Sequence, residues 1–153
     1  MAGCDRGRIG NGPALWAERD GEQWLIRDPK LLARAKALLA PIEKLGREQG
    51  ELGKQQGALG AKMGELGKQQ GDLGGKMGQL SADPERNEAQ MDRLGEQMDK
   101  LGQVMDKLGE QMDRLGEQMD GLGEQMDRMS HQIERQMGAL VDEARAGGQA
   151  QKF

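Results

Sequence analysis

A seven-residue repeat of leucine runs through most of this 153-residue chain and limits the folds that it can adopt. Leucine stands at positions 45, 52, 59, 66, 73 and 80 and again, in the same phase, at 94, 101, 108, 115 and 122. With leucine assigned to heptad position d, position a is mostly methionine, glutamine or isoleucine. Apolar residues spaced alternately three and four apart form the seam of a left-handed coiled coil. The repeat therefore predicts long helices that pair along one stripe.

The predicted interaction seam follows positions a and d through both halves of the repeat. Its residues are Leu45, Leu52, Leu59, Leu66, Leu73, Leu80, Met91, Leu94, Met98, Leu101, Met105, Leu108, Met112, Leu115, Met119, Leu122 and Met126. We interpret the methionines as packing residues or as the lining of a groove for a partner helix. Met126, Met129 and His131 are close in sequence, but stripe methionines seven residues apart lie about 10 Å apart on a helix, too far to share an ion. Gln49, Gln56 and Gln70 at position a either set register and oligomer state or mark an arm that is not tightly packed.

Glycine forms a second stripe beside the seam. It occupies position e at 46, 53, 60, 67, 74, 95, 102, 109, 116 and 123, and also position b in the first half. There are 11 glycines between Ile42 and Leu80 and seven between Met91 and Leu140, a handicap on the order of 18 kcal/mol relative to alanine in a helix. Three structures remain open: helices that pack closely at the glycines, a β-solenoid, or a first half that is disordered without a partner. A period of seven fits poorly with the two-residue alternation of strands, which favours the helices.

The glycine pattern lapses across residues 81–87, where Asp83 before Pro84 is typical of a helix cap and a first helical residue. We expect a reversal here, which gives an antiparallel helical hairpin of residues 28–80 against 84–141. Six basic and five acidic residues give residues 42–80 of the first arm a net charge of +1, whereas seven basic and fifteen acidic residues give residues 85–143 a net charge of −8. The heptad phase is the same before and after residues 81–87, which a loop does not require. A single kinked helix in a parallel oligomer is therefore the alternative.

Upstream of the repeat, Asp20 and Gly21 form a tight-turn signal between two short segments with strand character. Trp16 and Trp24 in these segments pack against the start of the helical arm or form a patch that docks a partner.

The predicted fold is thus mainly all-α, an elongated antiparallel helical hairpin or coiled coil with a small N-terminal β-hairpin. Its segments are a flexible N-terminus (1–13), the β-hairpin (14–28), the first heptad arm (29–80), a turn or linker (81–90), the second heptad arm (91–141) and a flexible tail (142–153).

Composition excludes several classes of function. The net charge of −4 predicts no general affinity for nucleic acid, and no apolar run approaches the roughly 20 residues of a membrane span. With one histidine and one cysteine, we expect no metal site, no cofactor and no catalysis. No apolar segment near Met1 is typical of a secretory signal, so the cytoplasm is the default location. If the N-terminus is truncated, the cell envelope is the alternative location.

Residues 24–80 begin Trp-Leu-Ile-Arg-Asp-Pro-Lys-Leu-Leu and continue in Leu-Gly-Lys-Gln-Gln-Gly repeats. This segment resembles a group of uncharacterised bacterial proteins with Leu-Gly-x-Gln-Gln-Gly heptads, and its repeats also look like those appended to some membrane-bound antibiotic-sensing metallopeptidase regulators. No metallopeptidase motif is present here, so the resemblance implies no activity. We expect a structural or scaffolding coiled-coil protein that acts by self-association, as a homo-oligomer, or by protein binding. The alternative is a regulatory module whose N-terminal hairpin docks a partner while the repeat spaces or oligomerises it.

Overall fold

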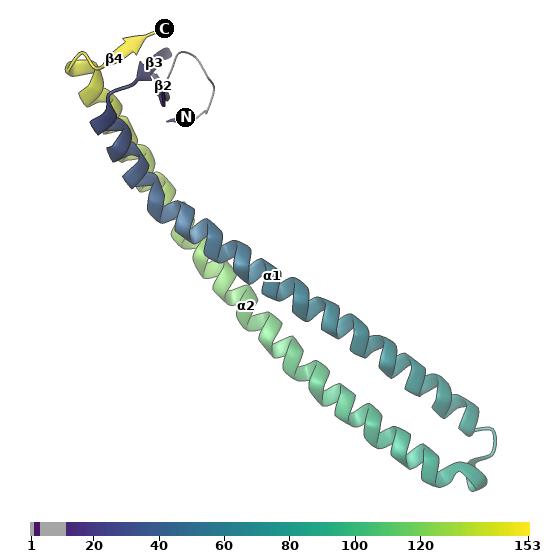
Figure 1. Ribbon diagram of the computed structural model, residues 1–153. Helices are drawn as coiled ribbons and strands as arrows, with labels where there is room; N and C mark the ends of the chain where they lie inside the picture. Colours follow the sequence, from purple (N-terminus) through teal and green to yellow (C-terminus); the bar gives the residue numbers. More distant parts are fainter. Residues whose placement is uncertain (1, 4–11) are drawn as a thin grey trace. The chain divides into compact units, whose positions relative to one another are not determined.

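The computed structural model describes residues 2–3 and 12–153 of the chain. Its elements in chain order are β1 (Ala2–Gly3), β2 (Leu15–Arg19), β3 (Glu22–Ile26), α1 (Pro29–Leu80), α2 (Pro84–Ala146) and β4 (Ala150–Lys152) (Figure 1). The chain is mainly α, with two long helices joined by a turn and a small antiparallel β-hairpin before them. The predicted fold class is therefore confirmed, and the β-solenoid alternative is wrong. Most of the predicted flexible segment 1–13 lies outside the described residues, and residues 2–3 form a strand.

The chain divides into two compact units. The first, which we call the sheet unit, comprises Met1–Glu48 and Leu122–Phe153; the second, the hairpin unit, comprises Gln49–Gly121. The sheet unit contains the strands, the beginning of α1 and the end of α2. The hairpin unit contains the remaining parts of both helices and the turn between them. The glycine repeat therefore lies mainly in the hairpin unit.

The strands of the sheet unit form one antiparallel sheet in the order β1-β2-β3-β4. β2 and β3 are joined by Asp20 and Gly21, whose φ angles of 58° and 75° are both positive. Two central residues with positive φ are typical of the type I′ turn, whose twist matches that of the flanking strands. The turn pairs Leu15 with Ile26. Because side chains alternate along a strand, Leu15, Ala17 and Ile26 lie on one face of the sheet.

The hydrophobic core of the sheet unit packs this face against the ends of the two helices. Its members are Leu15, Ala17, Ile26, Leu31, Ala35, Ile133, Met137, Leu140, Val141 and Ala144. In α2 the buried stripe advances four residues from Ile133 to Met137, where a continued heptad would place Gln136. An added step of four residues shifts the phase of a coiled-coil stripe locally. The heptad register of α2 therefore changes within the closed core.

Both helices of the sheet unit have well-formed caps. Asp28 caps α1, because its Oδ1 accepts hydrogen bonds of 3.0 Å from the backbone N–H groups of Lys30 and Leu31. At the end of α2, Gly148 has a φ of 67° and the N–H of Gln149 donates to the carbonyl of Ala144 at 2.8 Å. This is the Schellman arrangement, in which a left-handed glycine ends the helix and redirects the chain.

The redirected chain forms β4, which pairs with β3. The prediction of a flexible tail at 142–153 is therefore wrong. Helix α2 continues to Ala146, and the residues after its cap complete the sheet. Because β4 is short and polar, its residues carry no strand signal.

The two helices of the hairpin unit are joined at Ser81–Asp83. Ser81 Oγ donates a hydrogen bond of 2.7 Å to the carbonyl of Gly78, and Asn87 Nδ2 donates one of 3.1 Å to the carbonyl of Leu80. These bonds satisfy carbonyl groups that the end of α1 leaves without helical partners. The predicted reversal is confirmed, and the kinked single helix is wrong. The predicted linker 81–90 is shorter than expected, because α2 already begins at Pro84.

Candidate functional site

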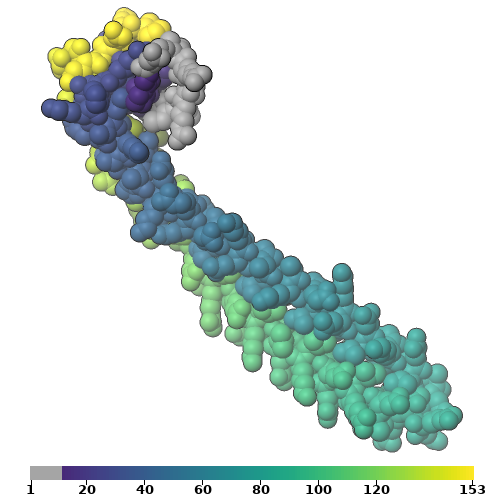
Figure 2. Space-filling model, viewed as in Figure 1, coloured from purple at the N-terminus to yellow at the C-terminus, as the bar shows by residue number. Residues whose placement is uncertain are grey.

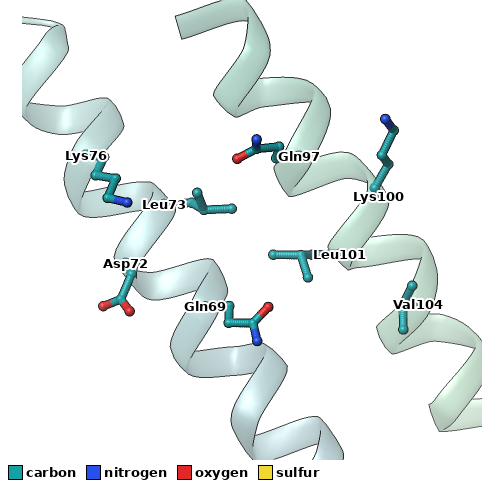
Figure 3. A pocket seen from close by; sticks show the side chains of 8 residues that line it. All are labelled: Gln69, Asp72, Leu73, Lys76, Gln97, Lys100, Leu101 and Val104. Atoms are coloured by element: carbon teal, nitrogen blue, oxygen red, sulfur yellow. The ribbon is translucent and has the colours of Figure 1, made fainter. Parts of the chain in front are cut away.

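The predicted interaction seam is half-buried at every one of its residues. In the hairpin unit, Leu73 of α1 and Leu101 of α2 point toward each other across the seam (Figure 3). Leu59 and Leu115 meet in the same way two heptads further from the turn. The structure describes all of Gln49–Gly121, and no residue in this range is fully buried. The seam therefore brings its apolar side chains together without closing over them.

Two open grooves follow the leucine layers on one side of the seam. The larger, of about 450 Å³, is lined by Gln69, Asp72, Leu73, Lys76, Gln97, Lys100, Leu101 and Val104 (Figure 3). The smaller, of about 380 Å³, is lined by Gln55, Ala58, Leu59, Gln111, Arg114 and Leu115. In both grooves the leucines meet at the centre, and mostly long polar side chains of heptad positions c and g flank them. Val104, at position g, is 45% exposed.

The other side of the seam, which the position-e glycines line, is empty. A Cβ atom built on the helical glycines of the hairpin unit would meet no atom within 4 Å beyond its own helix backbone, except at Gly95. At Gly95 the nearest atom is the methyl group of Met77, at an ordinary contact distance of 4.0 Å. The interpretation that the glycines bring the two helices of one chain into close contact is therefore wrong. Because side chains at position e normally flank the a and d layers, their absence leaves this side uncovered.

The charges of the hairpin unit are not matched across the seam. Among residues 49–121, the ion pairs are Lys54 with Glu51 at 3.0 Å and Arg114 with Glu110 at 3.9 Å, each within one helix. In this unit α1 carries four basic and three acidic residues, a net charge of +1, whereas α2 carries five basic and ten acidic residues, a net charge of −5. Long side chains of α2 project outward as separate ridges (Figure 2). The acidic excess of α2 thus faces solvent.

The two predicted docking residues lie on opposite faces of the sheet. Trp24 is the cross-strand neighbour of Ala17 on the face toward the helices, and the guanidinium carbon of Arg145 lies 4.7 Å from its ring centroid, a cation–π contact. Trp16 is on the other face, where its ring centroid lies 4.8 Å from that of Phe153. The sequence pointed to the start of α1 as the packing surface, but both rings contact residues near the C-terminus. Phe153 is 65% exposed, so its ring presents an aromatic surface to solvent beside Trp16.

Charged side chains connect the sheet to the last turns of α2. Arg19 Nε and Nη2 donate hydrogen bonds of 3.2 and 3.0 Å to the two carboxylate oxygens of Asp142. These bonds and the charge of Asp142 raise the pKa of Arg19. Arg145 lies 3.0 Å from the carboxylate of Asp20, which occupies the turn between β2 and β3. The β-hairpin is thus joined to α2 by oriented ion pairs as well as by apolar packing.

Across residues 2–3 and 12–153, no group of three His, Cys, Asp or Glu side chains is placed to hold a metal ion. His131 is exposed, and its Nδ1 lies 3.9 Å from Glu134 Oε2. No helix within the described part of the chain is long and apolar enough to cross a membrane.

No protein-family model matches the sequence, and no curated protein or solved structure is significantly similar to it. The resemblance of residues 24–80 to bacterial repeat proteins therefore stays a prediction. The geometry of the seam and of the sheet unit is what carries the functional interpretation.

The heptad spacing indicates the stripe of a and d residues, but not the surroundings of the tryptophans. Arg145 and Phe153 fell in a segment that was predicted to be flexible. One signal was available, because Ile133, Met137, Leu140 and Ala144 follow the spacing of a buried helical stripe. Nothing in the sequence around Phe153 indicates that it returns to the ring of Trp16.

We predict that the sheet unit loses stability as the pH falls through a lowered pKa of Glu143. Arg34 Nη1 donates hydrogen bonds of 2.8 and 2.9 Å to this carboxylate, and these bonds and the charge of Arg34 lower its pKa. A carboxyl whose pKa is lower in the folded state contributes stability that is complete above its unfolded pKa and is lost as the pH falls through the folded value. An NMR titration of the Glu143 carboxyl carbon measures this pKa. Arg34→Gln should return it toward the usual glutamate value, and an identical pKa in the variant would contradict the assignment.

Proposed function

We propose that this protein is a structural protein that acts by association, and that the Leu/Met seam of its hairpin unit binds helices of itself or of another protein. One observation carries the proposal. The leucine and methionine side chains of Gln49–Gly121 are aligned along a single stripe but remain half-buried, whereas the sheet unit has a closed core. An aligned and incompletely covered apolar stripe is the surface that helix-in-groove and coiled-coil partners recognise.

The composition of the hairpin unit supports a dependence on such a partner. Its 15 glycines handicap the helices by on the order of 15 kcal/mol relative to alanine. Ion pairs within one exposed helix each contribute only a few tenths of a kcal/mol. Further burial of the seam is the remaining source of stabilisation, at roughly 25 cal/mol per Å² of apolar surface. Association would supply it.

The proposal assigns the protein no catalytic role and no cofactor, because the acidic and basic side chains of the hairpin unit lie on exposed helix faces. It assigns no nucleic-acid partner, since the net charge of −4 would repel a polyanion. We place the protein in the cytoplasm as part of the same proposal. The single cysteine is compatible with a reducing compartment.

The proposal predicts that the helices of the hairpin unit are ordered only by association. At concentrations where sedimentation shows a monomer, amide hydrogens of residues 49–121 should exchange at least about 100-fold faster than those of Leu140 and Ala144 in the closed core, because opening the seam exposes little apolar surface. Protection should rise as the concentration of the chain or of a partner helix is raised. Hydrogen exchange with mass spectrometry provides the measurement. A monomer whose hairpin unit is as well protected as the core needs no partner, and the proposal would then fail.

A second candidate function follows from the aromatic surface of the sheet unit. Phe153 is exposed beside Trp16 on the face that points away from the helices. Exposed aromatic side chains are typical anchors in protein interfaces. This surface supports the alternative in which the sheet docks a partner protein while the repeat acts as a spacer.

A photo-cross-linking amino acid at two neighbouring positions tests this candidate in cells. Phe153 and Lys152 lie next to each other at the end of the chain but on opposite faces of the sheet. If the aromatic surface docks a partner, a cross-linker at position 153 should give one defined product with another protein, and the same group at position 152 should not. Equal yields from both positions, or no product from position 153, would remove this candidate.

A further inference from the structure

We propose that the occupant of the open seam is a second copy of this chain, which docks on the glycine-lined side of the hairpin unit. In this arrangement α1 of each copy lies over α2 of the other. The inference rests on the proposed function, because it names the partner of the same seam. It goes further in fixing which side of the seam is covered and in which orientation.

The glycine-lined side is the less costly side to cover. On the opposite side, a docking helix would displace or immobilise long side chains such as Lys76, Lys100 and Arg114, which line the grooves. Ordering such side chains costs rotamer entropy, and burying their charges costs more. Position e offers no side chain to order and no charge to desolvate. The space next to its glycines is free, so the backbone of another helix can approach the seam closely.

The glycine-lined side has two edges, one along α1 and one along α2, which we call its rims. They complement each other in shape and charge. In α1, position b is also glycine, and the next position, f, carries Lys54 and Lys68, both exposed. In α2, position b carries five exposed aspartates: Asp92, Asp99, Asp106, Asp113 and Asp120. None of these aspartates forms an ion pair within the described part of the chain. The α1 rim is basic and has no side chains at position b, and the α2 rim is acidic. When a second copy faces this side with its helices exchanged, the basic rim of each copy meets the acidic rim of the other.

The orientation of the second copy follows from the positions of these charges along the helix axis, which we call their levels. Because Leu59 lies level with Leu115 and Leu73 with Leu101 in antiparallel helices, Lys68 lies level with Asp106. A half-turn about the long axis of the hairpin unit keeps every residue at its level and places α1 over α2 of the second copy. Lys68 then meets Asp106 of that copy. The other face-to-face arrangement would lay α2 along α2 and oppose the aspartate rims, which repel each other.

Matched glycine variants of the full-length chain test which side is covered. Gly116→Ala adds a Cβ atom at position e of α2, whereas Gly121→Ala adds one at position c of the same helix, away from that side. Both sites are open in one copy, so both variants should raise the helicity of the monomer. Only the position-e variant should weaken the dimer, by about tenfold or more in the dissociation constant, because its Cβ atom meets the second copy. Sedimentation equilibrium measures this constant.

Charge reversal tests the orientation. Lys68→Glu should weaken the dimer, and Lys68→Glu combined with Asp106→Lys should restore it, because the pair re-forms between copies with its signs exchanged. A double variant that is weaker than Lys68→Glu alone contradicts the arrangement of α1 over α2.

The outcomes separate this inference from the proposed function. A dimer that tolerates the position-e alanine as well as the control alanine docks elsewhere, which overturns the inference and leaves association intact. A wild-type chain that stays monomeric at all concentrations also overturns it. In that case the hydrogen exchange of residues 49–121 decides the proposed function: fast exchange leaves another protein as the partner, and slow exchange removes the need for any.

Discussion

The constraint on which this structure depends is a coiled-coil seam whose flanking position has no side chain. In an ordinary coiled coil, residues at positions e and g cover the a and d layers with their methylene groups. Here position g supplies that cover on one side, whereas position e supplies none. Leu73 and Leu101 meet as expected, yet they remain partly exposed. The glycines thus weaken the isolated helices and at the same time uncover the surface that can offset that weakness.

The sheet unit supplies what the hairpin unit lacks. Its core holds α1 and α2 at the ends that are joined to the sheet, through Leu31 on one helix and Leu140 on the other. The cap at Asp28 and the ion pair of Arg19 with Asp142 fix where each helix begins or ends relative to the sheet. Because both helices continue from this core into the glycine repeat, the entropy of bringing the two arms together is partly spent before the seam forms. A weak seam can then hold a defined register.

Local sequence patterns predict the helices and turns of this fold better than they predict the contacts between distant residues. The two helices, the reversal before Pro84 and the β-hairpin at Asp20 follow from local signals, since each depends on neighbouring residues. The strand β4 and the ring contact of Trp16 with Phe153 depend on residues far apart in the chain and have no local signal. The sequence also shows the glycine stripe, but the close helix contact expected at these glycines is not made within the chain. Sequence alone shows that position e is empty and cannot show whether the opposing helix of the same chain fills the space.

The glycines raise one last physical question, which is why alanine does not stand in their place. The structure of one copy has room for a Cβ at Gly74 and Gly116, and alanine there would favour the helix by about 1 kcal/mol per site. A chain that required only a stable hairpin would therefore gain from alanine at position e. A chain that orders its helices on association requires the reverse: arms that are weak alone and a surface that a second helix can approach closely. Glycine recurs at position e and not at position g, which is the pattern that the second requirement predicts.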